Sequence, residues 1–190
     1  MKIDFLNSYR PTVTVMIQSK TASNAINTIR NAAYEGADAF GLQICRLAPE
    51  EREHLKEIYA ASAGRPFYIT NYRYGYNEGM SDEECMQGLL DGLKLGGNLG
   101  DIMGDTFGRA ADEITRDIPA IDKQRKLIDE IHSMGKSVLM SSHLYRYAGA
   151  DEVLEIAYEH QRRGADATKA QPPLKFVRFV TDNMDYTADR

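Results

Sequence analysis

Apolar segments and helix-like segments alternate along this chain, and that alternation limits the folds open to it. Short runs rich in β-branched residues, such as Thr12–Gln18 (TVTVMIQ), recur at intervals of roughly 25 to 35 residues. Segments with apolar residues at helical spacing, such as Ile118–Met134, lie between them. Because neighbouring parallel strands need a long, usually helical, crossover, this rhythm predicts an α/β fold with a parallel sheet.

Six strands are expected from this pattern. They fall within residues 12–18, 37–47, 65–72, 99–105, 136–143 and 165–171. The intervening helices carry start signals, namely Thr21 or Ser23 as a cap and a capping box over residues 81–84. A helix is expected over residues 144–164, and the run Leu174–Val180 is expected to form a last helix or an edge strand.

Two architectures fit six strands alternating with helices: a (β/α) TIM-type barrel and an open doubly wound sheet. A closed barrel needs eight strands and usually at least ~200 residues. The chain has 190 residues, so we expect a single domain over residues 1–190 that forms an incomplete barrel of about six βα units. No strand is followed by a dinucleotide-binding or P-loop glycine motif, which weakens the open-sheet alternative. Exposed strand edges would favour self-association, so a homodimer is a possible assembly.

Composition excludes several classes of partner. The net charge is −5 and no basic block occurs, which argues against nucleic acid as the main partner. No apolar run has the length needed to cross a membrane. Cys45 and Cys85 lie far apart, so neither a disulfide framework nor a cysteine-based zinc site is expected. Free thiols, together with an N-terminus unlike a signal peptide, predict a cytoplasmic protein.

Two consecutive predicted strands end on side chains capable of chemistry. His143 ends the first and Lys169 lies near the end of the second. Parallel neighbours lie about 5 Å apart, so an imidazole and an amine would project into one pocket. Burial disfavours the charged form of a lysine, and the neutral amine can add to a ketone. Histidine can then move protons at the adjacent carbon, without a metal or cofactor. The expected partner is therefore a small keto substrate.

Other polar residues around this strand pair have simpler expected places. Ser141 and Ser142 could orient the imidazole, and Thr168 could line the same wall. The remaining histidines (His54, His132 and His160) fall on amphipathic helices, where we expect surface or helix-end positions.

From Thr12 to Gln171 the chain resembles type I 3-dehydroquinate dehydratase, a Schiff-base enzyme of the aldolase-type barrel superfamily. The likeness is carried by five stretches: VTVMIQSKTASNAINTIRNAAYEGADAF, RPFYITNYR, YGYNEGMSDEE, KSVLMSSH and GADATKA. The last two are the most specific. The resemblance implies His143 as general acid/base and Lys169 as the imine-forming lysine of a carbon–oxygen lyase of the shikimate pathway, which supplies aromatic amino acid biosynthesis.

The chain departs from that family where substrate is bound. The family's second strand carries a Glu-x-Arg pair, whereas this chain reads GLQICR, so Gly41 or Gln43 stands where the glutamate is expected and Gln43 or Cys45 where the arginine is. Gln43 and Arg46 are the expected substrate-binding residues, Arg46 only with a change of register. In the third strand the arginine is displaced by one residue, at Arg73, and Asp105 stands for the acidic position of the fourth. Nothing corresponds to the family's last two strands, so three explanations stay open: the chain is truncated, a partner completes the site, or the substrate differs.

Three functions follow from these residues. The first is dehydration of 3-dehydroquinate, and the second is Schiff-base aldol cleavage or dehydration of another keto substrate. The missing Glu-x-Arg pair favours the second. The third is a non-catalytic binding protein that keeps the fold.

Overall fold

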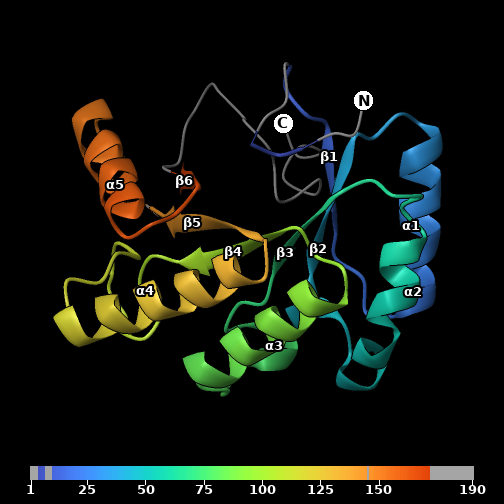
Figure 1. Ribbon diagram of the computed structural model, residues 1–190, viewed down its shortest axis with the longest axis horizontal. Coiled ribbons are helices and arrows are strands. Elements are labelled where there is room, and N and C mark those ends of the chain that lie inside the picture. The colour runs from blue at the N-terminus through green and yellow to red at the C-terminus, as the bar shows by residue number, and fades with distance from the viewer. Residues whose placement is uncertain (1–3, 7–9, 145, 172–190) are drawn as a thin grey trace. The chain divides into compact units, whose positions relative to one another are not determined.

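The computed structural model describes residues 4–6, 10–144 and 146–171, which divide into two compact units (Figure 1). The first unit runs to Asn98 and the second begins at Leu99. Each unit holds three parallel strands in sequence order, so the predicted α/β fold with six parallel strands is confirmed. The element expected over residues 174–180 lies outside the described residues.

In the first unit β1 pairs with β2 and β2 with β3, and helices follow each strand (Figure 1). The strands are β1 (Thr14–Ile17), β2 (Ala39–Gln43) and β3 (Phe67–Thr70). The α-helices are α1 (Ala22–Tyr34), α2 (Leu55–Ala60) and α3 (Asp82–Leu95), and the 3-10 helices are η1 (Ile44–Arg46), η2 (Pro49–His54) and η3 (Gly75–Asn77). Thr21 caps α1, and the predicted capping box begins α3 at Ser81.

Both faces of this first sheet are buried, which explains why its strands read as continuous apolar runs. On one face Phe40 packs against Phe67 with ring centroids 5.6 Å apart, and Tyr59 of α2 meets Phe67 edge-on at 4.8 Å. On the other face Met16 lies so close to Gly41 that a Cβ there would fall 1.9 Å from its sulfur. A larger residue at the middle of β2 would therefore force the Met16 side chain to move.

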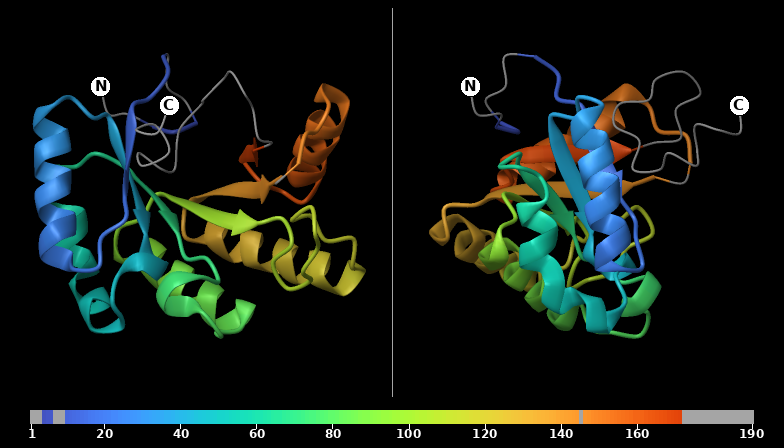
Figure 2. Two further views of the ribbon diagram at one scale, coloured as in Figure 1. Left: turned by 180° about the vertical axis from the view of Figure 1, so that it is seen from behind. Right: turned by 90° about the vertical axis from the view of Figure 1, so that its right-hand side faces the viewer.

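In the second unit β4 (Leu99–Met103) pairs with β5 (Ser137–His143), and β5 pairs with β6 (Ala167–Gln171). Helix α4 (Ile118–Ser133) runs along β4 and β5, as Figure 2 shows from behind, and α5 (Ala150–Arg162) packs on β5 and β6. The segment from Gly104 to Asp117 connects β4 to α4 without forming a helix or strand.

Two predicted elements are too long. The strand expected to reach Leu47 ends at Gln43, because Leu47 N–H donates to the Ile44 carbonyl and closes a 3-10 turn. The helix expected from Leu144 begins only at Ala150, since Gly149 has an extended backbone at the N-cap. Helical spacing alone does not locate either boundary.

No helix among the described residues combines the length and the hydropathy that a membrane crossing demands.

We predict that the ion pair between Arg10 and Asp38 stabilises the folded protein, because it joins the segment before β1 to the residue that precedes β2. Arg10 donates two hydrogen bonds of 2.6 Å to the Asp38 carboxylate, which also accepts from Val13 N–H at 2.9 Å. Arg10, followed by the Val13 bond, lowers the pKa of Asp38 to about 2. The carboxylate therefore contributes stability above its unfolded pKa, and the contribution is lost as the pH falls towards 2.

Asp38→Asn should lower the free energy of unfolding at pH 7 by about 1 to 2 kcal/mol, an amount reduced by the partial exposure of Arg10. Urea unfolding at several pH values measures this, and the gap to the wild type should shrink below pH 4. Asp129→Asn, on an exposed position of α4, is the matched control. An equal loss in both variants would contradict the prediction.

Candidate active site

The pairing of β5 with β6 sets Lys169 beside Ser141, two residues before His143. Side chains of registered neighbours share a face, and they alternate between faces along a strand, so Lys169 and His143 lie on the same face of the sheet. Strand spacing puts their Cα atoms roughly 8 Å apart. The Lys169 side chain is half-buried and that of His143 is 18% exposed.

Ser141 contacts a buried carboxylate on the same face. Its hydroxyl donates to Asp101 Oδ1 at 2.6 Å, and both residues are fully buried. One residue of β4 is in register with Ser141 of β5 and, across it, with Lys169 of β6. Asp101 lies two residues before that β4 residue, and so on the same face. The lysine is therefore placed on a polar stretch of an otherwise apolar sheet.

His143 is held by Glu113, from the connection between β4 and α4. Glu113 Oε2 lies 2.7 Å from His143 Nδ1 and also accepts the His143 backbone N–H at 2.7 Å. A carboxylate only accepts hydrogen bonds, so Nδ1 must carry the proton, and in the neutral ring Nε2 then carries the lone pair. The carboxylate thus fixes both the ring orientation and the tautomer that can act as a base.

Glu113 was missed in the sequence because it lies in an irregular segment 30 residues from its partner. Its backbone has φ +49°, a left-handed conformation that costs a residue with a Cβ roughly 1 to 2 kcal/mol. The only sequence signal is a carboxylate in the connection after the preceding strand. Asp105, the acidic residue predicted there, is buried, and its carboxylate accepts from Ala110 N–H at 3.1 Å.

His160 lies in the last turn of α5, so the helix-end position expected for it is correct, but it is fully buried and the surface position is wrong. Its Nδ1 lies 2.6 Å from Thr168 Oγ1, and its Nε2 lies 3.0 Å from Ser142 Oγ. Burial, reinforced by the charge of Arg163, lowers the pKa of His160 to about 4. The helical spacing of Ile156 and His160, both buried in α5, was the signal available in the sequence.

The hydroxyls of Ser142 and Thr168 therefore face α5, away from the side of the sheet that carries His143. Ser142 donates to the Glu113 carbonyl at 2.7 Å. The Glu113 carboxylate orients the His143 ring, whereas Ser141 donates to Asp101 and Ser142 to the Glu113 carbonyl, so the expectation that the serines orient the ring directly is not confirmed.

The other predicted substrate-binding residues lie in the first unit. Gln43 ends β2 and is buried, and its Oε1 has no hydrogen-bond partner among the residues described, as is also true of Oγ1 of its register neighbour Thr70. Arg46 is exposed, with its guanidinium 5.0 Å from the centre of the Tyr74 ring. Arg73 is mostly buried, with Nε 3.9 Å from an Asp82 oxygen.

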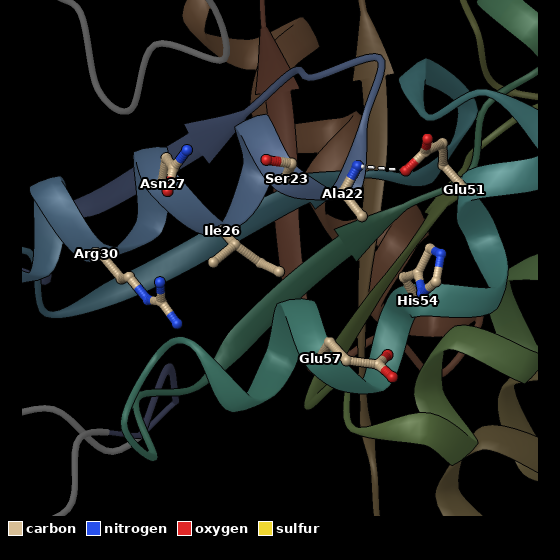
Figure 3. Close-up of a pocket in the computed structure, with 8 residues that line it drawn as sticks. All are labelled: Ala22, Ser23, Ile26, Asn27, Arg30, Glu51, His54 and Glu57. Carbon is tan, nitrogen blue, oxygen red and sulfur yellow. Dashed lines mark hydrogen bonds between the residues drawn. The ribbon is translucent and has the colours of Figure 1, made fainter.

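The surface of the described residues has two hollows that none of the predicted site residues lines. One, of about 410 Å³, lies in the first unit between α1 and the η2–α2 segment, where Glu51 accepts from Ala22 N–H at 2.8 Å (Figure 3). The other, of about 540 Å³, lies in the second unit and is lined by Ala110, Ala111, Asp112, Arg116, Leu144 and Arg146. The second is built from segments that flank Glu113 and His143 in sequence. Within the described ranges, no three metal-binding side chains come together.

We predict that the left-handed backbone at Glu113 can be measured by comparing two substitutions. Glu113→Ala and Glu113→Gly both remove the carboxylate, but only glycine adopts φ +49° without strain. The glycine variant should therefore be the more stable, by about 1 kcal/mol in urea unfolding. At exposed Glu130 in α4 the order should reverse, because glycine is a poor helix former. The same order at both positions would contradict the prediction.

A second prediction concerns the pH dependence of stability. A histidine with a pKa of about 4 when folded and 6.5 when unfolded takes up protons on unfolding between those values. The contribution of His160 is complete above pH 6.5 and is lost as the pH falls towards 4. Of the charged groups facing the ring, Arg163 strengthens this effect and Glu159 opposes it.

Between pH 7 and pH 4 the wild type should lose roughly 2 to 3 kcal/mol more than His160→Gln, which does not titrate. Chemical unfolding at each pH measures the difference. His54→Gln, at an exposed position, should keep the wild-type pH dependence. A parallel pH profile for the wild type and His160→Gln would show that the buried ring is not the titrating group.

Comparisons with known proteins identify the fold. No family model and no curated protein matches the chain. Among solved structures, 3-dehydroquinate dehydratase from Geobacillus kaustophilus HTA426 matches with a TM-score of 0.71 at 11% identity, over 89% of this chain and 65% of that one. The type I enzyme from Clostridium difficile, with covalently modified comenic acid, matches with a TM-score of 0.69 at 16% identity, over 89% and 66%.

A 3-hexulose-6-phosphate synthase also matches, with a TM-score of 0.56 at 12% identity, over 88% of this chain and 70% of that one. These structural neighbours are enzymes, and the chain spans about two-thirds of the length of the dehydratases. The chain has the α/β fold of TIM-barrel enzymes, with six parallel strands, and it is similar in structure to type I 3-dehydroquinate dehydratases at low identity.

Proposed function

We propose that this protein is a lyase that forms an imine between Lys169 and a small β-hydroxy ketone and then eliminates water, as a type I 3-dehydroquinate dehydratase does. The observation that supports this most is the β5–β6 register, which sets Lys169 beside Ser141 and two residues from His143 on one face. A primary amine and an imidazole at this separation can act on adjacent carbons of one substrate.

The reaction begins when the neutral Lys169 amine adds to the ketone carbon, and loss of water gives an iminium ion. His143 Nε2 then takes a proton from the neighbouring carbon, and the released electron pair flows into the iminium to give an enamine. The enamine expels the β-hydroxyl, which leaves as water with the proton from His143. Hydrolysis of the new iminium frees the amine and the unsaturated ketone, so the net change is loss of one water.

Glu113 and Asp101 support this assignment from the protein side. Glu113 holds the His143 ring with Nδ1 protonated, which leaves Nε2 for the proton transfers. A carboxylate beside a histidine also stabilises the imidazolium that forms during the reaction. The bond from Ser141 to Asp101 fixes the side chain that neighbours Lys169 in the register.

A second candidate is a Schiff-base enzyme that acts on a different keto compound. It is favoured by the lack of a Glu-x-Arg pair in residues 41–46, where Gln43 offers a neutral amide instead. A neutral amide hydrogen-bonds a hydroxyl or carbonyl group and does not neutralise a charged substituent.

The test is reductive trapping. Incubation with 3-dehydroquinate and borohydride, followed by peptide mass spectrometry, should place a reduced adduct on Lys169. Lys169→Ala should abolish the adduct, whereas Lys136→Ala, at a half-buried lysine just before β5, should retain it. His143→Ala should still form the reduced adduct. Its rate of forming the conjugated ketone, measured by absorbance, should fall by at least about 100-fold.

Each outcome separates the candidates. An adduct that forms only with other ketones would replace 3-dehydroquinate as the substrate and support the second candidate. No adduct with any ketone would contradict both and leave a binding protein with this fold. Unchanged turnover in His143→Ala would remove the histidine from the mechanism.

A further inference from the structure

We infer that His160 is a positioning residue for His143, acting from the opposite face of β5 through Ser142 and the backbone of Glu113. This inference rests on the proposed function, because it assigns to a buried polar network the task of holding the proton-transferring histidine in one tautomer.

The directions of the hydrogen bonds form a single chain. Ser142 has one proton, and it donates that proton to the Glu113 carbonyl, which can only accept. Ser142 Oγ must therefore accept from His160 Nε2–H, at 3.0 Å. His160 Nδ1 then carries the lone pair and accepts the Thr168 hydroxyl at 2.6 Å. Every bond in this chain is satisfied by a neutral His160 ring.

Two adjacent residues of β5 hold Glu113, one at its backbone carbonyl and the other at its side-chain carboxylate. Ser142 holds its carbonyl on the face towards α5, and His143 holds its carboxylate through the ring and the backbone N–H. The Glu113 N–H donates to the Ala110 carbonyl at 3.1 Å, so the backbone amide of Glu113 is held as well. Such anchoring is needed because the left-handed conformation of Glu113 would otherwise relax.

The close approach of these groups also explains Gly104. A Cβ at this position would lie 2.6 Å from the Glu113 carbonyl oxygen, 2.8 Å from Ser142 Oγ and 3.0 Å from His160 Nε2. No side chain fits among these atoms without separating them. The lack of a side chain at Gly104 thus allows Ser142 and His160 to approach the segment that carries Glu113.

Arg163, the C-cap residue of α5 one turn after His160, holds the rest of this connection. Its guanidinium donates to the carbonyls of Gly104 at 2.8 Å and Thr115 at 2.6 Å, and to Gln124 Oε1 at 2.8 Å. Arg163 therefore fixes the two sides of the loop, while His160 fixes the residue within it that faces His143. The two roles are separable by substitution.

The test reads the tautomer of His143 directly, by 15N chemical shifts of the imidazole nitrogens. The chain has four histidines, so single substitutions assign each ring. The wild type should show His143 protonated on Nδ1. In His160→Leu and in Ser142→Ala the ratio of Nδ1–H to Nε2–H tautomers should fall roughly fivefold, the effect of one hydrogen bond. His160→Gln, whose amide can still donate to Ser142, should restore most of the wild-type ratio.

His132→Leu is the matched control, because His132 pairs with Asp166 at 2.8 Å near the start of β5. This variant removes a histidine–carboxylate pair elsewhere in the same unit and should leave the His143 ratio unchanged. A wild-type ratio in both His160→Leu and Ser142→Ala, or an equal fall in His132→Leu, would overturn the inference. If one of the first two variants fails to fold, the other decides.

The measurement needs no substrate, so it is independent of the proposed reaction. Failure of borohydride trapping in the wild type would contradict the lyase and leave the tautomer result standing. If trapping succeeds, His160→Leu should form the adduct as the wild type does but release the unsaturated ketone more slowly. His160→Gln should recover the rate.

Discussion

The clamp that Glu113 forms over the end of β5 is the interaction on which the candidate site depends. One carboxylate oxygen accepts both the backbone N–H and the ring Nδ1–H of His143, each at 2.7 Å. The two bonds fix where the strand ends and how its last side chain is turned. Because both donors lie on one residue, the ring cannot rotate without breaking the clamp. The β5–β6 register then sets the distance from that ring to Lys169.

A buried polar network supports the clamp from the side of α5. His160, Ser142 and the Glu113 carbonyl form one chain of hydrogen bonds, and Arg163 holds the flanking backbone. Burying these groups costs free energy unless every donor and acceptor has a partner. Any arrangement that leaves one of them unpaired is therefore disfavoured, which makes the fully paired arrangement specific. The segment from Gly104 to Asp117 needs this support, because it has no helix or strand of its own.

The comparisons separate fold from function. Structures as different as 3-dehydroquinate dehydratases and a 3-hexulose-6-phosphate synthase match the chain at 11 to 16% and 12% identity respectively. A fold shared this widely hosts many reactions, so the function must be argued from the site. Here the argument comes from the second unit, where an amine, an imidazole and two carboxylates lie on or beside neighbouring strands.

The sequence by itself determined the order and type of the elements, because apolar periodicity and capping residues act within a few positions of one another. The capping box at Ser81 and the strand that ends on His143 are of this kind. The same local signals placed His143 and Lys169 on consecutive strands, but they did not locate the ends of β2 or the start of α5.

Tertiary structure alone decided which groups meet. The contact between Glu113 and His143 joins residues 30 positions apart through a left-handed turn, and no periodic pattern encodes it. The burial of His160 depends on which face of α5 lies against β5 and β6. An amphipathic pattern that ends in His and Arg does not show whether these two residues lie on that face. Long-range hydrogen bonds between irregular segments are set by the packing of the whole unit, and for that reason the residues that orient the site were the ones the sequence did not reveal.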